Sequence, residues 1–348
     1  MDSLTQVALG GAVGYAVLGS KVGRKAIIWG AILGTLPDLD VLLPYAGEVE
    51  SFTYHRGFSH SLLVHLLASP VIVWLILKLH TTTQQYKKHW FWLVFLCLST
   101  HAALDSFTVY GTQLMWPFTE HPFGVSNLFI IDPFYTFPLL FCLAIAALPK
   151  ISVPNATRIN IIGLVVSSAY ICWSLVAKVY IDQKVDMALE QRGIVPTAFL
   201  SSPAPLSTLL WRIVVMTENE YYEGYASIFD DPADISLTAY TTQPELLNEI
   251  SDEWRVQRLQ WFTKGFYAIK RQQADVILSD LRMGAECNYV FSFVVGEITQ
   301  SGVQVGSFEK RTERPDLSKV GSVWDRISDP RVSLAPMMVD NECKKNLP

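Results

Sequence analysis

Acidic and histidine side chains lie in short polar stretches inside the apolar N-terminal half of this 348-residue chain. Ionisable groups at membrane depth are costly to desolvate, and by default they mark functional sites. Imidazole and carboxylate together are typical ligands of zinc, manganese or iron, metals that can activate water for hydrolysis. We therefore predict a metal site with ligands drawn from Asp2, Asp38, Asp40, His55, His60, His101, Asp105 and Asp132.

The spacing of these residues supports the prediction to different degrees. His101 and Asp105 are four residues apart, so they share one face if their segment is helical. A hydrogen bond along a helix face would explain that pair equally well. Asp38 and Asp40 follow Pro37 directly, and capping of a helix is their alternative role. That alternative is weak in an apolar run, because uncompensated carboxylates are expensive there.

The stretch from His55 to His60 brackets a short glycine-containing turn. Arg56 is suited to a bidentate contact with an anionic substrate oxygen, and we predict that it acts in catalysis with Asp38 and His60. Ser59 and Ser61 are expected to cap the following helix rather than to act as nucleophiles. Asp2 and Asp132 are expected to be additional ligands or to support the ligands from behind.

Apolar segments of helical length must position these side chains. We expect about six of them to form a membrane helical bundle, at residues 4–20, 26–44, 60–79, 90–106, 133–149 and 159–181. The last is the cleanest membrane-spanning candidate, and some of the others are short or polar enough to be only partly immersed. The first is rich in glycine and alanine, which allow close helix packing in a membrane.

Basic residues in the connections indicate an orientation for such a bundle. If all six segments span, one set of connections receives eight lysines and arginines and the other receives Arg56 alone. The positive-inside rule places the first set in the cytoplasm. The predicted ligands and the C-terminal half then lie together on the extracytoplasmic side, as a single polynuclear site requires.

The C-terminal half has the composition of a soluble domain. Residues 1–181 carry 10 basic and 8 acidic side chains, net +2, whereas residues 182–348 carry 17 and 24, net −7. Alternating apolar and polar residues favour a small α+β domain with a mainly antiparallel sheet. We therefore expect a membrane-embedded helical domain over 1–182 and a soluble domain over 183–348. The acidic balance argues against nucleic acid as a partner.

Two further features bear on the compartment. The start Met-Asp-Ser lacks a basic region ahead of the apolar stretch, so we expect no cleaved signal peptide. Cys97, Cys142 and Cys172 lie in apolar segments, whereas Cys287 and Cys343 lie in the polar half and would pair in an oxidising compartment.

The polar motifs resemble those of the LexA-regulated, membrane-bound metal-dependent hydrolase family of bacteria. The resemblance rests on the Met-Asp start with Thr5, Pro37-Asp38-Leu39-Asp40, the HRGFSHS stretch at 55–61, His101 with Asp105, Tyr110-Gly111-Thr112, and Asp132-Pro133, and it covers roughly residues 1–180. It implies a place in the bacterial inner membrane, a helical metal core distantly like zinc-dependent phospholipase C and P1 nuclease, and phosphoester substrates. Many members have histidine where this chain has Gln6.

These observations predict a multi-pass membrane hydrolase that uses metal-activated water on a phosphoester, with a lipid or lipid-linked molecule as the expected substrate. The expected cofactor is one to three divalent transition-metal ions, zinc first, with manganese or iron as alternatives, and membrane lipids are the expected partners. A cation or proton transporter and a non-catalytic scaffold with a structural metal site are the rival interpretations. The oligomeric state is left open.

Overall fold

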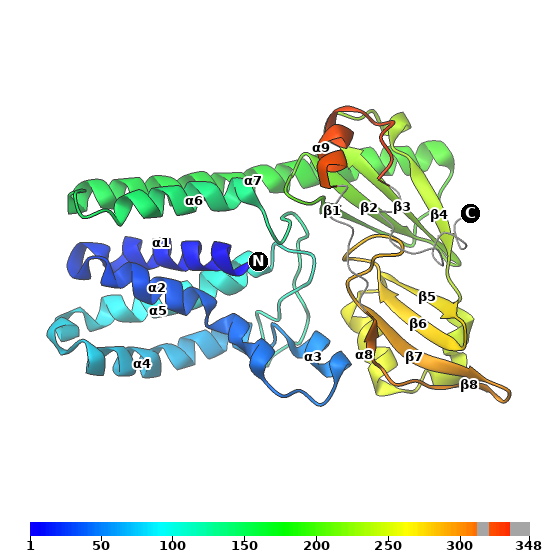
Figure 1. Ribbon diagram of the computed structural model, residues 1–348, viewed down its shortest axis with the longest axis horizontal. Coiled ribbons are helices and arrows are strands. Elements are labelled where there is room, and N and C mark those ends of the chain that lie inside the picture. The colour runs from blue at the N-terminus through cyan, green and yellow to red at the C-terminus, as the bar shows by residue number, and fades with distance from the viewer. Residues whose placement is uncertain (312–319, 335–348) are drawn as a thin grey trace. The chain divides into compact units, whose positions relative to one another are not determined.

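A computed structural model describes residues 1–311 and 320–334 of the chain (Figure 1). These residues form two compact units. The first, called the helical unit, comprises Met1–Leu43 and Tyr54–Leu175. The second, called the sheet unit, comprises Pro44–Thr53 and the described residues from Val176 onward.

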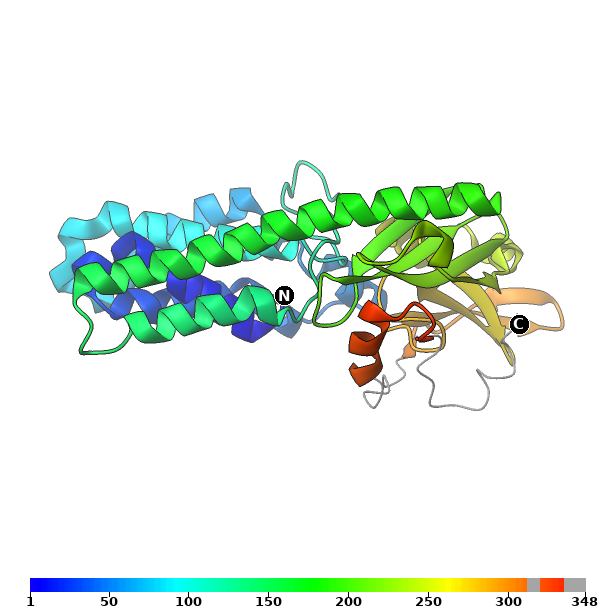
Figure 2. The ribbon, with the colours of Figure 1, turned by 90° about the horizontal axis from the view of Figure 1, so that it is seen from above.

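Every apolar segment predicted for the N-terminal half contains a helix. The helical region consists of α1 (Ser3–Val22), α2 (Lys25–Thr35), η1 (Pro37–Leu42), η2 (Phe58–His60), α4 (Leu62–Leu79), η3 (Thr81–Tyr86), α5 (Lys87–Asp105), α6 (Pro133–Ala146) and α7 (Val153–Arg192). The expectation of a helical N-terminal region is therefore confirmed. Helix α7 runs without a break for 40 residues, from the helical unit into the sheet unit (Figure 2).

The expectation of about six membrane-spanning helices is too high. Among the described residues, α4 and α7 are the two helices long and apolar enough to cross a membrane. Helices α2 and α6 are apolar but have 11 and 14 residues, fewer than the roughly 20 that a bilayer core requires. Helix α5 is long enough but begins with two lysines and ends with Asp105. A prediction from apolar composition alone therefore gave too many membrane-spanning helices.

Glycines bring α1 and α2 into unusually close contact. A Cβ atom added to Gly30 would lie 2.1 Å from the carbonyl oxygen of Gly10, and one added to Gly10 would lie 2.2 Å from that of Gly30. A Cβ added to Gly34 would meet the carbonyl oxygen of Gln6 at 2.5 Å. Only glycine allows the two backbones to lie this close. The contact holds in place the end of α2 that leads into η1.

The sheet unit confirms the expected antiparallel architecture. One sheet has the order β1 (Ala198–Pro203), β2 (Leu210–Met216), β3 (Glu220–Ser227) and β4 (Leu237–Thr241). The other has β5 (Tyr267–Gln272), β6 (Asp275–Asp280), β7 (Ser292–Thr299) and β8 (Gly302–Val305), with β9 (Lys310–Arg311) also pairing with β7. All of these pairs are antiparallel. The described helices of this unit include η4 (Pro232–Asp234), η5 (Pro244–Ile250), α8 (Trp254–Phe262) and α9 (Val320–Ser328).

A short segment from the N-terminal half completes the sheet unit. Helix α3 (Glu48–Tyr54) carries Phe52, which is buried. The Phe52 ring lies 4.3 Å from that of Phe291, 4.8 Å from that of Phe262 and 5.4 Å from that of Phe293, measured between ring centroids. Cys343 lies outside the described residues, so its pairing with Cys287 stays a prediction.

Candidate metal centre

Four of the predicted ligands come together in the helical unit. One ligand atom from each of Asp38, His60, His101 and Asp105 lies within 4.8 Å of all the others. The side chains of His60, His101 and Asp105 are fully buried, whereas that of Asp38 is 24% exposed. This group could hold a metal ion, as the residue types predicted.

Three chain segments bring these side chains together. Pro37 begins η1 directly after α2, and this short helix carries Asp38. His60 ends η2, after which Ser61 caps the N-terminus of α4 through the backbone N–H of Val64. His101 and Asp105 lie one turn apart on α5, so the predicted shared helix face is observed.

Hydrogen bonds to Nδ1 determine the tautomer of both imidazole rings. Nδ1 of His101 lies 2.6 Å from the carbonyl oxygen of Gly34, which can only accept, so this nitrogen carries the hydrogen. Nδ1 of His60 lies 2.9 Å from the hydroxyl of Ser59, which itself donates to Asp40 at 2.6 Å. Nδ1 of His60 is therefore also a donor. In the neutral rings, both Nε2 atoms are left as bare acceptors.

These two acceptors face each other and two carboxylates. The Nε2 atoms of His60 and His101 are 3.1 Å apart. Oδ1 of Asp38 lies 3.6 Å from the first and 3.4 Å from the second. Oδ2 of Asp105 lies 3.3 Å and 3.5 Å from the same two atoms. Four acceptor atoms thus converge, an arrangement that is stable only with protons or a cation between them.

The two oxygens of Asp105 have different surroundings. Oδ1 accepts from the side-chain amide of Gln6 at 2.9 Å and from the amino group of Met1. Oδ2 is buried and has no hydrogen-bond partner among the described residues. The nearby Nε of Arg56, 3.1 Å away, supplies charge without an aligned hydrogen bond. An orphaned carboxylate oxygen aimed at two imidazole nitrogens fits a metal ligand.

Asp40 and His55 lie one layer behind the converging atoms. Oδ1 of Asp40 lies 2.7 Å from Nδ1 of His55, and Oδ2 accepts from Ser59 and from the backbone N–H of Arg56. Asp40 therefore orients the turn that carries His60. Neither Asp40 nor His55 belongs to the group of four.

Charge pairing shifts the ionisation of this cluster. Burial raises the pKa of Asp38, but the adjacent imidazoles of His101 and His60, in their protonated form, outweigh it and hold that pKa below its usual range. Burial likewise opposes ionisation of Asp40, and its bond to His55 lowers the pKa overall. Burial lowers the pKa of His60, whereas the neighbouring carboxylates of Asp105 and Asp38 raise it, with a net upward shift.

Asp2 and Asp132 are helix caps in the structure and do not join the four ligands. Asp2 caps α1 by accepting from the backbone N–H of Thr5 at 3.1 Å. Asp132 caps α6 through the backbone N–H groups of Phe134 and Tyr135, and its other oxygen accepts from the Tyr170 hydroxyl at 3.0 Å. Their carboxylates are thus occupied locally.

Arg56 is buried against the metal centre. Its Nη1 donates to the hydroxyl of Thr108 at 3.0 Å, and its guanidinium lies over the ring of Tyr110 at 5.1 Å. The residue predicted to hold a substrate oxygen therefore also places a fixed positive charge beside Asp105.

Sequence reasoning missed two contributors. Ser59 was predicted to cap a helix, but it links His60 to Asp40, and Ser61 is the cap. Gln6 was noted only for differing from histidine, yet its buried amide orients Asp105. The signal for Gln6 was its amide within an apolar helix, since such a group must find a buried partner.

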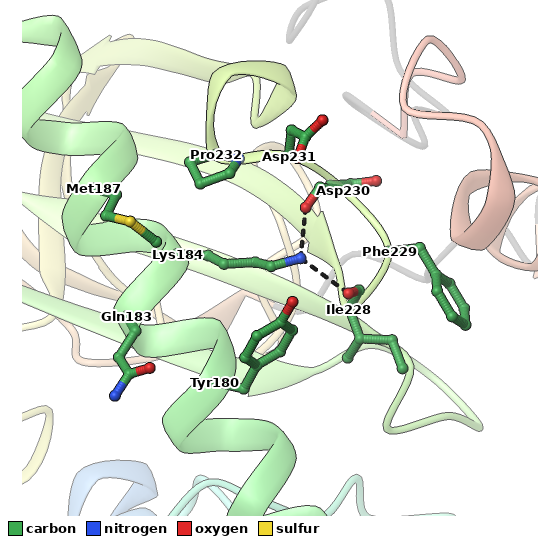
Figure 3. A pocket seen from close by; sticks show the side chains of 9 residues that line it. All are labelled: Tyr180, Gln183, Lys184, Met187, Ile228, Phe229, Asp230, Asp231 and Pro232. Atoms are coloured by element: carbon green, nitrogen blue, oxygen red, sulfur yellow. Dashed lines mark hydrogen bonds between the residues drawn. The ribbon is translucent and has the colours of Figure 1, made fainter.

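A pocket of about 440 Å³ in the sheet unit is a weaker candidate site (Figure 3). Its central cation is Lys184, whose Nζ donates to the carbonyl oxygens of Ile228 at 2.9 Å and Asp230 at 2.5 Å. The carboxylate of Asp230 is bound by Arg326. Lys184 and Asp230 of this pocket are thus already engaged, unlike the converging acceptors of the helical unit.

Comparisons with known proteins assign the helical half to a family. The uncharacterised protein YfhP of Bacillus subtilis (strain 168) is 28% identical over 243 residues, which cover 66% of this chain and 71% of that protein. No solved structure matches the chain. The model of the YdjM inner membrane protein family matches residues 1–181, which include every predicted ligand. The chain belongs to the YdjM inner membrane protein family.

Proposed function

We propose that this protein is a membrane-bound metal-dependent hydrolase that cleaves phosphoesters of lipid or lipid-linked molecules. The observation that carries the proposal is the convergence of four acceptor atoms, from Asp38, His60, His101 and Asp105, with one carboxylate oxygen left orphaned. The phosphoester class comes from the resemblance in the sequence motifs, and the positive charge of Arg56 beside the site is compatible with it.

Two imidazoles and two carboxylates favour zinc, with manganese and iron as alternatives. A divalent metal held there would supply a water of lowered pKa and would stabilise charge on the phosphoryl group. The sequence allowed one to three ions, and the group of four described here accounts for one.

The protein's own residues would divide the remaining work. Gly34 and Ser59 keep the two imidazoles oriented with Nε2 facing inward. Asp38, the partly exposed member of the group, marks the side from which water and substrate arrive. Arg56 would offset the negative charge of the phosphoester, with its guanidinium held in place by Thr108. The ester P–O bond breaks as the water oxygen bonds to phosphorus, and the leaving alcohol takes a proton.

The proposal places the site and the sheet unit on the extracytoplasmic side of a bacterial inner membrane. The family's assignment supports the inner membrane, and the side is the one that the basic residues predict for a chain with six spans. Cysteine accessibility in intact cells, probed at positions 46 and 84, would test this orientation.

Metal analysis of the purified protein tests the centre itself. We expect about one transition-metal ion per chain, and its loss in the His60→Ala and Asp105→Ala variants, because each removes a converging ligand. His89→Ala, which alters an exposed histidine of α5, is the matched control and should keep its metal. A parent protein without stoichiometric metal, or variants that retain it, would refute the metal centre.

Activity is tested separately with two phosphodiesters. The metal-loaded protein should hydrolyse bis(p-nitrophenyl) phosphate or vesicles of dioleoylphosphatidylglycerol, and prior chelation should abolish this. Cation or proton flux into liposomes without hydrolysis would instead favour the transporter. The partial exposure of Asp38 argues against a structural site, in which all four ligands would be closed off from water.

A further inference from the structure

The short helix that carries Asp38 and Asp40 presents opposite characters on its two sides. Asp40 is buried, and Asp38 reaches the metal centre. Between and after them, Leu39 is 52%, Val41 61% and Leu42 75% exposed. This six-residue helix directs its carboxylates to the site and leaves its large apolar side chains more than half exposed.

This apolar edge lies at the accessible side of the metal centre. Asp38 is the one partly exposed residue of the four, since the side chains of His60, His101 and Asp105 are fully buried. A substrate must therefore pass the η1 segment to reach the converging atoms. Phe58, two residues before His60 on η2, is also exposed and adds a second apolar side chain near this approach.

The position of η1 along the membrane normal follows from the neighbouring span. Helix α4, a membrane-spanning candidate, begins at Leu62, two residues after His60. A span that begins at Leu62 would set the proposed metal centre at the level where headgroups meet acyl chains. Exposed leucine and valine are stabilised at that level by insertion into the boundary region. In water the same patch would be unfavourable.

We propose that η1 is a lipid-facing lip, and that Leu39 and Leu42 select a phosphoester that resides in the bilayer over one dissolved in water. The apolar side chains would contact the glycerol and acyl portion next to the phosphate as it approaches Asp38. This inference rests on the proposed hydrolase function. It makes the two leucines determinants of specificity and leaves the metal ligands unchanged.

The test compares two diesters in the same metal-loaded, full-length protein. A Leu39→Gln/Leu42→Gln variant should hydrolyse dioleoylphosphatidylglycerol vesicles about tenfold more slowly, mainly through a higher KM, and bis(p-nitrophenyl) phosphate within about twofold of the parent rate. Leu79→Gln, an equally exposed leucine at the far end of α4, should change neither rate. Equal loss on both substrates, or no loss on vesicles, would overturn the lip.

A second measurement separates failure of the lip from failure of the hydrolase. A fluorophore attached to Leu42→Cys, with the labelled parent chain as the blank, should be quenched by brominated phospholipid in reconstituted vesicles. If neither diester is cleaved but quenching occurs, the hydrolase function fails and the membrane contact of η1 stands. Absence of quenching refutes the lip, and concentration-dependent dimerisation that is lost in the double variant would assign the patch to a second copy of the chain.

Discussion

At the scale of single residues, the proposed metal centre depends on side chains that hold its candidate ligands from behind. Ser59 is the clearest of them, because its hydroxyl accepts from Nδ1 of His60 and donates to Asp40. Without it, the His60 ring loses the contact that keeps Nε2 facing inward. Removal of a group that hydrogen-bonds to a metal ligand typically lowers metal affinity by roughly 10–100-fold.

We therefore expect Ser59→Ala to bind zinc about 10–100-fold more weakly than the parent while remaining folded. Competition with a chelating dye measures the affinity, and circular dichroism checks the helix content. Ser106→Ala is the control, because that hydroxyl bonds only to the carbonyl oxygen of Ala103 at 2.6 Å in the described structure. Equal zinc affinity in Ser59→Ala and the parent would show that His60 is oriented by other contacts.

Residue types and spacing could predict part of this centre but not its boundary. The i, i+4 pair His101 and Asp105 needs only a helix to converge, and the helix was readable from the apolar run. Asp2 and Asp132 have the same residue type as the ligands and similar apolar surroundings, yet they cap helices. The choice between ligand and cap depends on where the backbone N–H groups of a helix start point, which residue type does not specify.

At the scale of elements, the close contact between α1 and α2 positions residues of the proposed metal centre. Helix α2 supplies the Gly34 carbonyl that orients His101 and leads directly into η1 with Asp38. Its approach to α1 leaves no space for a Cβ at Gly30, which would lie 2.1 Å from a backbone oxygen. Rigid backbone, unlike a side-chain tip, cannot move aside for it.

Gly30→Ala should therefore push the helices apart and destabilise the helical unit by about 1–3 kcal/mol through overpacking. Metal content should also fall, since both Gly34 and Asp38 would shift. Thermal unfolding in detergent and metal analysis measure the two effects. Gly321→Ala on α9, where an added Cβ meets nothing within 4 Å, should leave both unchanged. A Gly30→Ala protein with the parent's melting temperature would contradict the close-packing account.

Helix positions were predictable from apolar periodicity, but spans were not. Each of the predicted segments became helical, because an apolar run of sufficient length favours a helix in either solvent. Whether a helix crosses the bilayer depends on its exact ends, and α2 and α6 end too early. Helix ends are set by local breaks such as Pro37. The average composition of a segment does not show such a break, so it overestimates the length of the helix.

In the sheet unit, two tyrosines of the first sheet predict a dependence of stability on alkaline pH. Burial raises the pKa of Tyr225 to about 12, and burial beside Glu223 raises that of Tyr240 to about 12. An unfolded tyrosine titrates near pH 10. Between about pH 10 and 12 the folded state thus binds more protons than the unfolded state, and stability must fall as the pH rises.

We expect the urea midpoint of the sheet unit to decrease between pH 9 and pH 11. The Tyr225→Phe/Tyr240→Phe variant should show a shallower decrease, because phenylalanine has no proton to lose. Exposed Tyr180 supplies the control, and Tyr180→Phe should keep the parent's slope. Identical slopes in the parent and the double variant would place the alkaline sensitivity elsewhere.

At the scale of the whole molecule, one segment of the N-terminal half belongs to the sheet unit rather than to the helical unit that surrounds it in the sequence. Residues Pro44–Thr53 leave the helical unit between Asp40 and His55 and complete the sheet unit, in which Phe52 contacts three phenylalanines. No pattern in the sequence signalled this exchange, because the assignment of a ten-residue segment to another unit depends on tertiary contacts alone. The bond between Asp40 and His55 closes the base of the excursion inside the helical unit.

Phe52→Ala should consequently destabilise the sheet unit by about 3–5 kcal/mol, since it removes a buried ring and leaves a cavity. Metal content should stay at the parent level, because the base of the excursion is held independently by Asp40 and His55. Urea unfolding followed by near-ultraviolet circular dichroism reports the first effect, and metal analysis reports the second. Phe229→Ala, which alters an exposed ring of the same unit, should change stability by less than about 0.5 kcal/mol. If Phe52→Ala loses its metal while the sheet unit keeps the parent's stability, the excursion serves the metal centre rather than the sheet unit, and the assignment of Pro44–Thr53 to that unit is wrong.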